Sequence, residues 1–362
     1  MRVLFALPGL HRSDRGAEIA FISIATELAK AGDAVTLVGS GQARPGMPYK
    51  FVHAASVARE KFECCPSLPP LRNECSYEEL TFVPDFLLRY RPADYDVTIT
   101  CSYPFSNWVL RRPTVRGFRP PHVFVTQNGD WPAFARNWEY RLFGCDGLVC
   151  TNPDFYERQK GRWRCRLIPN GVDCSRFCIG PGRRDQFGLP EDRLIVLMVS
   201  ALIASKRVSA GIEAVSQLPD AHLVVVGDGP LREEIDATAN RLIPGRFMRL
   251  SVSPDRMPLV YRSADVFLHL SKVESSSLAF LEALATGLPV VAHDLQRLRF
   301  IAGDNAFLLD TDDVPAVAKC IEWASRSSPE GQKQRASRAA KYSWQNIGAL
   351  YQQFLKEIVD SW

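Results

Sequence analysis

The sequence predicts an α/β protein built from two Rossmann-like, doubly wound domains, and three observations support this expectation. The chain has 362 residues, which is more than one hydrophobic core usually organises. Apolar residues make up 46% and charged residues 23%, as in an ordinary globular protein. Short apolar runs alternate with amphipathic helical patterns, and this order builds parallel sheets that are covered by helices.

The first half of the chain opens with a clear strand–helix–strand unit and then becomes less regular. Apolar runs predict strands at residues 3–7, 34–38, 97–101, 123–126, 147–151 and 166–168. Helical periodicity predicts helices at residues 17–31, which Gly32 terminates, and at residues 77–90. Between residues 39 and 93 the remaining sequence has no clear period and includes a Pro-rich segment.

The second half alternates more regularly. Continuous apolar runs, as expected for strands buried on both faces, occur at residues 194–200, 222–226, 266–270 and 289–292. Helices are expected at residues 208–217, 231–241, 258–263, 277–286, 315–325 and 344–359. Turn-forming residues at 169–173 precede a Gly- and Pro-containing linker. We therefore expect a first domain at residues 1–173, a second domain at residues 174–342, and a final helix at residues 343–362.

The composition favours a cytoplasmic chain. The amino-terminal apolar run is too short for a signal peptide, and no stretch approaches the roughly 20 apolar residues that span a bilayer.

The ten cysteines show no CxxC pair, so we expect reduced thiols rather than a metal site. Residues 1–173 hold 22 Lys and Arg against 18 Asp and Glu. This mild excess of basic residues fits either peripheral contact with an anionic inner membrane face or an ordinary random distribution of surface charges. No nucleic-acid partner is expected.

A basic, aromatic loop lies between the strands predicted at residues 97–101 and 123–126. Its residues are Arg111, Arg112, Arg116 and Arg119, with Trp108 and Phe118 nearby. The loop fits two interpretations, a surface that meets phosphate or membrane and a plain solvated loop.

The segment from Ser271 to Val291 carries the clearest chemistry. It follows a buried strand and places serines before an apolar helix, where they suit the N-cap. In doubly wound sheets, ligands bind at the carboxyl ends of the strands. A helix that begins at such an end offers free backbone N–H groups and a positive dipole, so we expect a phosphate there.

Two carboxylates flank this expected anion site. Glu274 lies in the loop, and Glu282 lies about two turns into the helix. Glu282 is surrounded by apolar residues, and a carboxylate in such a helix needs a partner. In the alternative interpretation, Glu274 caps the helix and Glu282 is a surface charge.

These residues form a pattern that extends to Val291. A Glu, seven residues and a second Glu are followed by Ala-x-Ala-x-Gly-x-Pro-Val-Val. This pattern resembles the donor-binding motif of the retaining glycosyltransferases of family four. Residues 168–173, 225–230 and 261–267 also resemble that family, in the right order. The resemblance covers nearly the whole chain and implies the GT-B fold, with two Rossmann-like domains that face each other across a cleft. It also implies that the helix at residues 343–362 crosses back to the first domain, and the alternative is a plain carboxyl-terminal helix on the second domain.

The resemblance also implies roles for individual residues. Glu282 would bind the donor ribose, and Glu274 would contact the transferred sugar. The backbone amides of Ser276, Ser277 and Leu278 would hold that sugar and the distal phosphate.

Further contacts to the donor follow from the same resemblance. Gly16 matches the family's glycine loop, where the backbone approaches a diphosphate. The base would lie against the backbone near Ser253. The expected donor is a UDP- or GDP-sugar, and the expected acceptor is a hydroxyl of a lipid-linked, saccharide or small-molecule substrate.

The cations of the family pattern are only partly present. Lys206 stands at the position of the family's Lys and suits the negative charge of a departing diphosphate. Ala201 stands where an Arg is usual, so one cation is missing. Arg207 is a candidate to supply it, and a plain surface Lys-Arg pair is the alternative interpretation.

The sequence departs from the family pattern a second time, directly after the strand predicted at residues 123–126. Many relatives carry a His there, whereas this chain has Asn128 and Asp130. Asn128 is a candidate to bind the donor sugar, and Asp130 is a candidate to orient the acceptor hydroxyl or accept its proton. An Asn-Gly turn with a capping Asp explains the same residues.

Neither a metal nor another cofactor is expected. In the mechanism attributed to the family, the diphosphate leaves while the acceptor approaches on the same face of the sugar, and the departing phosphate takes the proton. Two Asp-x-Asp pairs, at residues 94–96 and 310–312, are interpreted as turns rather than as metal ligands.

Three other functions are alternatives to transfer. The G-x-G-x-x-G spacing of a nicotinamide dehydrogenase is absent. A nucleotide-sugar epimerase of similar architecture would share the donor cleft, but the Glu pair favours transfer. A non-catalytic nucleotide-sugar-binding subunit would account for Ala201 and Asn128.

Overall fold

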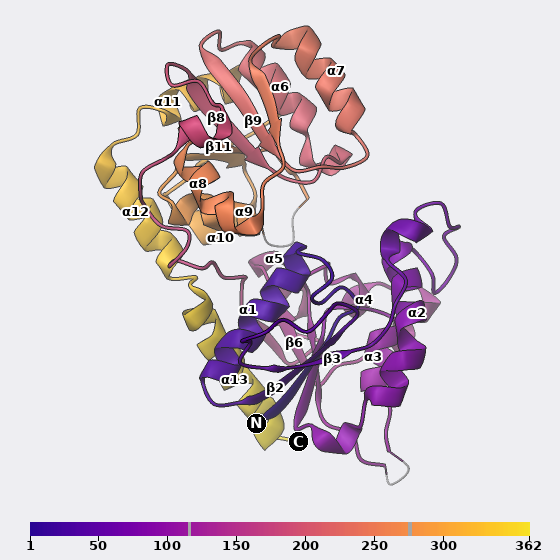
Figure 1. Cartoon of the computed structure of the whole chain (residues 1–362). Coiled ribbons are helices and arrows are strands. Elements are labelled where there is room, and N and C mark those ends of the chain that lie inside the picture. Colours follow the sequence, from indigo (N-terminus) through magenta and orange to yellow (C-terminus); the bar gives the residue numbers. More distant parts are fainter. Residues whose placement is uncertain (115–116, 274–276) are drawn as a thin grey trace. The chain divides into compact units, whose positions relative to one another are not determined.

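The computed structural model describes residues 1–114, 117–273 and 277–362 of the chain. These residues divide into two compact units, and each unit contains one parallel β-sheet covered by helices (Figure 1). Unit 1 comprises Met1–Asn170 together with Trp344–Trp362, and unit 2 comprises Gly171–Ser343. The predicted fold class, with two Rossmann-like sheets, is confirmed.

Unit 1 is organised around a seven-stranded sheet. Its strands are β1 (Arg2–Ala6), β2 (Ala34–Gly39), β3 (Lys50–His53), β4 (Val97–Thr100), β5 (His122–Val125), β6 (Gly147–Cys150) and β7 (Cys165–Leu167). Their order is β3-β2-β1-β4-β5-β6-β7, and all pairings are parallel. The strand order reverses between β1 and β4, and the crevice at the carboxyl ends of such a switch point is where this topology binds ligands.

Six α-helices and three 3-10 helices of unit 1 accompany the sheet in the described part of the chain. The α-helices are α1 (Gly16–Lys30), α2 (Glu74–Arg89), α3 (Phe105–Leu110), α4 (Trp131–Phe134), α5 (Pro153–Gln159) and α13 (Trp344–Asp360). The 3-10 helices are η1 (Arg59–Phe62), η2 (Pro92–Asp94) and η3 (Trp138–Leu142).

The last helix, α13, packs against the first, α1. Gly348 permits this contact, because a Cβ there would lie 2.6 Å from the Cβ of Glu27. Gln352 donates a hydrogen bond to Asp33 Oδ2 at 2.9 Å, directly after α1. The carboxyl-terminal helix is therefore an integral part of unit 1.

Unit 2 has a six-stranded sheet. Its strands are β8 (Leu194–Val199), β9 (Ala221–Val226), β10 (Phe247–Leu250), β11 (Val266–His269), β12 (Val290–His293) and β13 (Phe307–Leu309). They pair in parallel in the order β10-β9-β8-β11-β12-β13.

The α-helices of unit 2 are α6 (Val208–Ser216), α7 (Arg232–Leu242), α8 (Met257–Arg262), α9 (Leu278–Ala285), α10 (Gln296–Ala302), α11 (Val314–Ala324) and α12 (Pro329–Ala340). Its 3-10 helices are η4 (Arg184–Phe187), η5 (Ala204–Lys206) and η6 (Pro254–Arg256). The core lies between the sheet and helices such as α6 and α11, with fully buried Val196, Ile212, Leu223 and Ile321.

The sequence patterns did not predict the strands β3, β10 and β13, which are all edge strands. An edge strand is covered less than a central one, and β10 and β13 contain only half-buried residues. Their sequences therefore lack the continuous apolar run that identified β8 and β9. The short helices α3, α4, α5 and α10 and the polar helix α12 were not predicted either.

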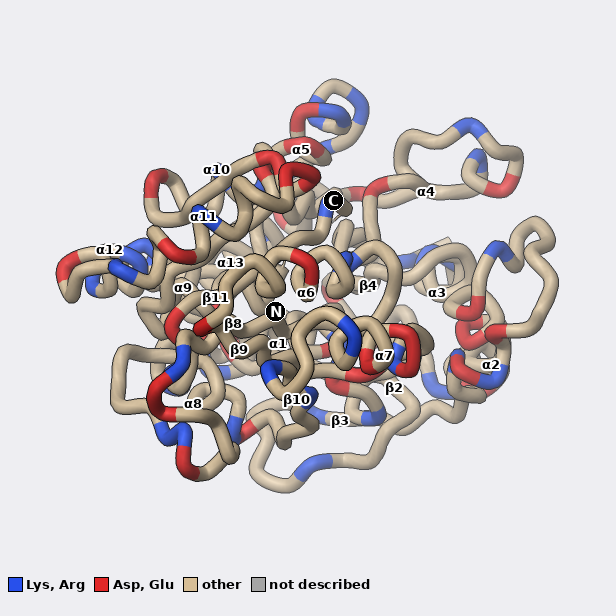
Figure 2. The backbone as a smooth tube through the Cα atoms, turned by 90° about the horizontal axis from the view of Figure 1, so that it is seen from above, with Lys and Arg blue, Asp and Glu red and all other residues tan. Residues whose placement is uncertain are grey.

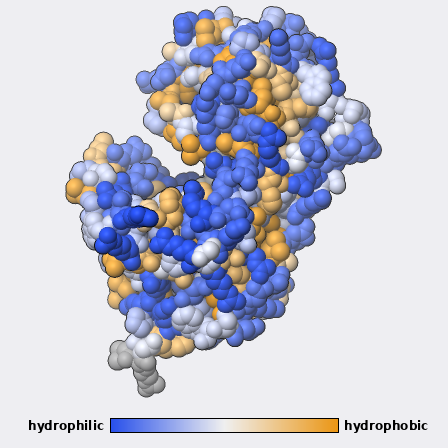
Figure 3. Space-filling view, turned by 180° about the vertical axis from the view of Figure 1, so that it is seen from behind, coloured by the Kyte–Doolittle hydropathy of each residue, from blue (hydrophilic) through white to orange (hydrophobic). Residues whose placement is uncertain are grey.

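The surface carries both signs of charge. Figure 2 shows basic and acidic residues interspersed on α2 and α7. The face in Figure 3 is hydrophilic over most of its area, with hydrophobic side chains between the polar ones. Among the described residues, no helix combines the length and apolarity that crossing a bilayer requires.

The basic loop predicted near residues 111–119 is largely tied to its own unit. Arg111 donates to Leu142 O at 2.9 Å, and Arg112 donates to Tyr90 O at 3.1 Å. Arg119 pairs with Asp146 at 2.6 Å, and Arg116 lies outside the described residues. These contacts favour the interpretation as an ordinary structural loop.

Candidate functional site

The carboxyl edge of the unit 2 sheet brings several predicted site residues together. Residues 274–276 follow β11 here, so the predicted Glu274 and Ser276 lie outside the described residues. Ser277 is the N-cap of α9, and its Oγ accepts a hydrogen bond from Phe280 N at 3.3 Å. The first amides of the helix, beginning with Leu278, have no acceptor within the helix, so this end suits an anion.

Glu282 lies on α9, and its partner is Tyr261 on α8. The Tyr261 hydroxyl donates a hydrogen bond to Glu282 Oε2 at 2.7 Å, and Tyr261 is fully buried. Burial raises the pKa of Glu282 to about 7, although Tyr261 and the charge of Arg176 oppose this rise. The sequence showed that Glu282 needed a partner, but the identity of that partner came only from the tertiary structure.

The two basic residues before α6 differ in their surroundings. Arg207 has a left-handed backbone with φ of 54°, and its guanidinium donates to Thr311 Oγ1 at 2.5 Å and to Asp312 Oδ1 at 2.7 Å. Arg207 therefore holds the loop after β13, which argues against its use in place of the missing Arg. Lys206 is half-buried at the end of η5, which follows the carboxyl end of β8.

Ser253 follows β10 at the same edge of the sheet. It is exposed and stands directly before η6. Lys206, Ser253, Leu278 and Glu282 thus all follow or border the carboxyl ends of the parallel strands in unit 2, as the doubly wound topology requires for a ligand site.

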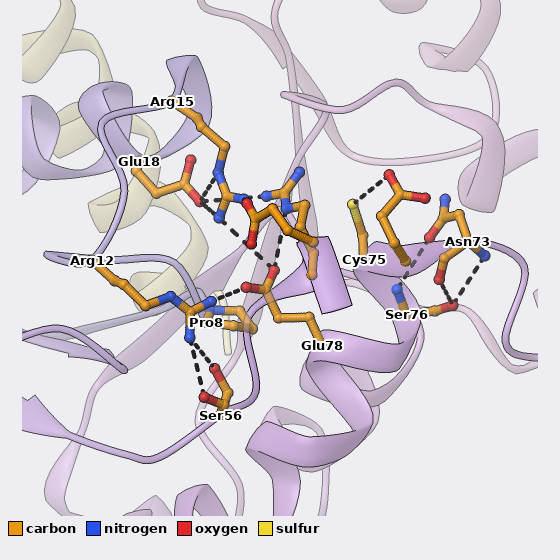
Figure 4. Close-up of polar contacts among 12 residues, drawn as sticks. Pro8, Arg12, Arg15, Glu18, Ser56, Asn73, Cys75, Ser76 and Glu78 are labelled. Carbon is orange, nitrogen blue, oxygen red and sulfur yellow. Dashed lines mark hydrogen bonds and ion pairs between the residues drawn. The ribbon is translucent and has the colours of Figure 1, made fainter. Parts of the chain in front are cut away.

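In unit 1, Gly16 begins α1, and a cluster of arginines and glutamates lies around this end of the helix (Figure 4). Arg15 donates to Glu18 Oε1 at 2.7 Å, and Arg12 donates to Glu78 and, at 2.9 Å, to Ser56. Arg59 lies 3.5 Å from Glu78 Oε2. We refer to Arg12, Arg15, Glu18, Arg59 and Glu78 as the α1 charge cluster.

The α1 charge cluster contains buried polar atoms that are not satisfied by the described residues. Glu18 is 1% exposed. Neither its Oε2 nor Nη1 of Arg15 has a hydrogen-bond partner among the described residues. Burial raises the pKa of Glu78, and the neighbouring arginines oppose the rise. The cluster thus offers both donors and an acceptor beside Gly16. The sequence pattern points only to Gly16, since Arg59 and Glu78 come from segments without a motif.

The two candidate residues after β5, Asn128 and Asp130, differ in exposure and in hydrogen bonding. Asn128 is exposed, and Gly129, with φ of 112°, forms the turn. Asp130 is 3% exposed, and its two oxygens accept hydrogen bonds from Arg158 at 2.8 Å each, with a further one from Gln159 at 2.8 Å. A carboxylate that is bound in this way anchors α5. The geometry therefore argues against Asp130 as the group that accepts the acceptor's proton.

Carboxylates of the two Asp-x-Asp pairs are engaged in ion pairs. Asp96 pairs with Arg2 at 2.7 Å. Asp312 pairs with Lys272 at 2.5 Å and with Arg207 at 2.7 Å. These contacts agree with the interpretation of both pairs as turn residues.

Comparison with known proteins matches both halves of the chain to glycosyltransferase models. The model described as Glycosyltransferase Family 4 matches residues 15–176, and the model described as Glycosyl transferases group 1 matches residues 182–342. Alpha-monoglucosyldiacylglycerol synthase of Streptococcus pneumoniae is 26% identical over 182 residues, which cover 46% of this chain and 41% of that protein. The matched segment is thus less than half of that relative's length.

Two solved structures share the fold over the whole chain. Sucrose-phosphate synthase from Thermosynechococcus elongatus has a TM-score of 0.79 at 19% identity, and the match covers 100% of both chains. Anabaena HepE in complex with UDP-glucose has a TM-score of 0.71 at 17% identity, again over 100% of both chains.

Proposed function

The chain belongs to the glycosyltransferases of family four, with the GT-B fold, and from this premise we propose that it is a retaining glycosyltransferase. It moves a sugar from a nucleotide-sugar donor to an acceptor hydroxyl. The observation that carries this proposal is the Glu282 carboxylate, which Tyr261 holds on the helix that begins at the carboxyl edge of the unit 2 sheet.

The donor binds to unit 2 in this proposal. The amino end of α9 receives the diphosphate, because the amides of Leu278 and its neighbours carry the positive end of the helix dipole. Glu282 accepts hydrogen bonds from the ribose hydroxyls, and the backbone near Ser253 meets the base. The donor is a UDP- or GDP-sugar, and the UDP-glucose complex of Anabaena HepE supports a UDP-sugar as the first to test.

The chemistry requires charge stabilisation rather than a cofactor. The bond between the anomeric carbon and the diphosphate oxygen breaks, and the acceptor oxygen bonds to that carbon on the same face. The acceptor proton passes to the departing phosphate. Lys206 and the α9 amides stabilise the negative charge that develops on the diphosphate. Glu274 and the amide of Ser276 contact the transferred sugar, and Asn128 contributes a hydrogen bond to it.

The acceptor binds to unit 1 in this proposal. The α1 charge cluster offers guanidinium groups and the Glu18 carboxylate beside Gly16, and these groups suit a substrate that carries both hydroxyls and negative charge. A lipid-linked or saccharide acceptor fits this chemistry. The name of the pneumococcal relative, a glucosyldiacylglycerol synthase, supports a lipid acceptor and peripheral contact with a membrane.

A second candidate function is a nucleotide-sugar-binding subunit without turnover. Two observations favour it. Ala201 replaces the usual Arg, and Arg207, the nearest candidate to replace its charge, is bound to Thr311 and Asp312.

A thermal-shift screen with UDP-, GDP-, ADP- and dTDP-sugars tests the donor site. A ligand that binds the folded state raises the melting temperature of the parent protein. Glu282→Ala should lose this shift, whereas Glu322→Ala, which removes an exposed glutamate of α11, should keep it. A full shift in Glu282→Ala would show that the donor binds elsewhere.

Turnover separates the two candidate functions. We expect the parent to hydrolyse the stabilising donor slowly and to transfer its sugar once an acceptor is supplied. Lys206→Ala should lower this rate. A donor that binds without hydrolysis or transfer to any tested acceptor would favour the non-catalytic subunit.

A further inference from the structure

Unit 2 contains a pocket at the opposite edge of its sheet from the amino end of α9, where the donor diphosphate is proposed to bind. The pocket has a volume of about 230 Å³ and is lined by Arg262, Asp265, Thr286, Gly287, Ser327 and Arg335, among others. Asp265 directly precedes β11, so the pocket borders the amino ends of the parallel strands. The amino end of α9 and Glu282 follow the carboxyl end of β11. The pocket and the amino end of α9 therefore lie at opposite edges of the sheet, and Tyr261, the partner of Glu282, also lines the pocket.

Arg335 is the central feature of this pocket. It lies on α12 and is 6% exposed. Its Nε donates to Gly287 O at 2.8 Å, and its Nη2 donates to Ser327 Oγ at 2.7 Å. Both acceptors are neutral, and burial lowers the pKa of Arg335 to about 10. A guanidinium has five N–H donors, so these two bonds use less than half of its capacity.

The charge of Arg335 has no carboxylate partner among the described residues. Burying a cation without a counter-charge is costly, and protein interiors normally supply one. Asp265 also lines the pocket, but Arg184 binds both of its oxygens, at 2.8 and 2.7 Å, and Ile195 N donates to it at 2.7 Å. Asp265, the carboxylate that lines the pocket, is thus already paired with Arg184, which does not line the pocket.

A second arginine reinforces the positive charge. Arg262 lines the same pocket, and its guanidinium donates to Cys178 O at 2.8 Å and to Arg176 O at 2.9 Å, which are again neutral acceptors. In addition, α12 carries Lys333 and Arg338 against a single acidic residue, Glu330. Figure 2 shows this excess of basic residues along α12.

The shape of the pocket is stabilised by close backbone packing. Gly287 has φ of 77°, and a Cβ there would lie 2.3 Å from Gln332 Cγ on α12. Its carbonyl is the acceptor that fixes Arg335. The guanidinium is thus held in place before any ligand arrives, and a preorganised donor group loses less entropy on binding.

We propose that this pocket is an oxyanion site that binds a phosphoryl group. The planar guanidinium of Arg335 matches two phosphate oxygens, and Arg262 and the hydroxyls of Ser327 and Ser328 at the pocket wall add further donors. The volume is far larger than the roughly 15 Å³ that a single water needs. The pocket therefore accepts a phosphate ion or the phosphoryl group of a small metabolite. This inference does not depend on the proposed transfer reaction.

Calorimetric titration with inorganic phosphate tests the proposal. The parent protein should bind phosphate, and Arg335→Gln should weaken the affinity by about tenfold or more, since a charged hydrogen bond contributes about 1.5–3 kcal/mol. Arg338→Gln is the matched control. It removes the same charge one turn along α12, from an arginine that donates to the carbonyl of Ile301 and does not line this pocket. Its phosphate affinity should stay within about twofold of the parent.

Three further arms complete the experiment. Arg262→Gln should also weaken phosphate binding, and it keeps the proposal testable if Arg335→Gln does not fold. Lys206→Ala should bind phosphate like the parent, which separates this site from the donor site, where Lys206 is proposed to meet the diphosphate. Glycerol 3-phosphate, titrated beside inorganic phosphate, distinguishes the sources: tighter binding of the organic phosphate indicates a metabolite, and equal binding indicates the free ion. Absence of phosphate binding, or equal affinity in the parent, Arg335→Gln and Arg262→Gln, would overturn the proposal.

Discussion

Tyr261 donates its hydroxyl hydrogen to Oε2 of Glu282 at 2.7 Å, and this contact joins α8 to α9. Tyr261 is fully buried, and the helix around Glu282 is otherwise apolar, with Phe280, Leu281 and Ala283 buried. A carboxylate in such surroundings is costly unless it is hydrogen-bonded. The tyrosine therefore allows a polar group to occupy an apolar helix at the carboxyl edge of the sheet.

Removing this hydroxyl should weaken donor binding. In Tyr261→Phe the carboxylate loses its fixed orientation, and we expect the donor affinity to fall by about three- to tenfold, which corresponds to the 0.5–1.5 kcal/mol of one hydrogen bond. The measurement is a donor titration by calorimetry. Tyr342→Phe is the control, because Tyr342 is also buried and donates to Phe300 O at 3.0 Å, away from Glu282. Equal losses of affinity in both variants would contradict this role of Tyr261.

The raised pKa of Glu282 predicts a pH dependence of stability. Burial raises this pKa from 4.5 to about 7, so the folded state binds the proton more tightly than the unfolded state does. The free energy of unfolding should therefore fall as the pH rises from about 4.5 to about 7, by up to about 3 kcal/mol. Urea unfolding of the parent and of Glu282→Gln at several pH values measures this difference. The same slope in both proteins would show that Glu282 does not titrate in this range.

Asp130 and Arg158 should respond unequally to substitution. Arg158→Gln leaves the Asp130 carboxylate 3% exposed without its cation, so we expect a loss of about 3 kcal/mol in the free energy of unfolding. Asp130→Asn leaves an arginine that is 44% exposed and can be hydrated, so the loss should be about 1 kcal/mol. Chemical denaturation measures both values. If Asp130→Asn instead abolished transfer while the protein remained folded, Asp130 would have a role in catalysis.

Gly9 should be required for the α1 charge cluster. A Cβ at this position would lie 2.0 Å from Glu18 Oε1 and 2.3 Å from Arg15 Nη2, so Gly9→Ala must displace the ion pair. We expect a loss of about 1–3 kcal/mol in stability, as for other overpacked sites. Gly161→Ala is the control, because a Cβ there meets nothing within 4 Å. Thermal unfolding of the two variants compares them, and equal melting temperatures would contradict the predicted clash.

The central strands were predictable because each is buried on both faces. Strands β8 and β9 consist almost entirely of apolar residues, and a run of this kind is visible in the sequence without any knowledge of its neighbours. The edge strands β3, β10 and β13 were not predictable in this way, because one side of an edge strand lacks a partner and its residues are only partly covered. The polar helix α12 was not predicted, because only two of its residues, Arg335 and Ala339, are buried.

The fold class, the family and the segment after β11 that marks the expected donor site were predictable from the sequence, because they depend on local periodicity and on residues close together in the chain. Only the tertiary structure showed that Tyr261 binds Glu282, that Asp130 is neutralised by Arg158, that Arg207 is bound to Thr311 and Asp312, and that Arg335 lines a pocket without a carboxylate partner among the described residues. The role of a charged side chain depends on which groups surround it and on how far water is excluded. Those groups come from distant segments, and folding brings them together.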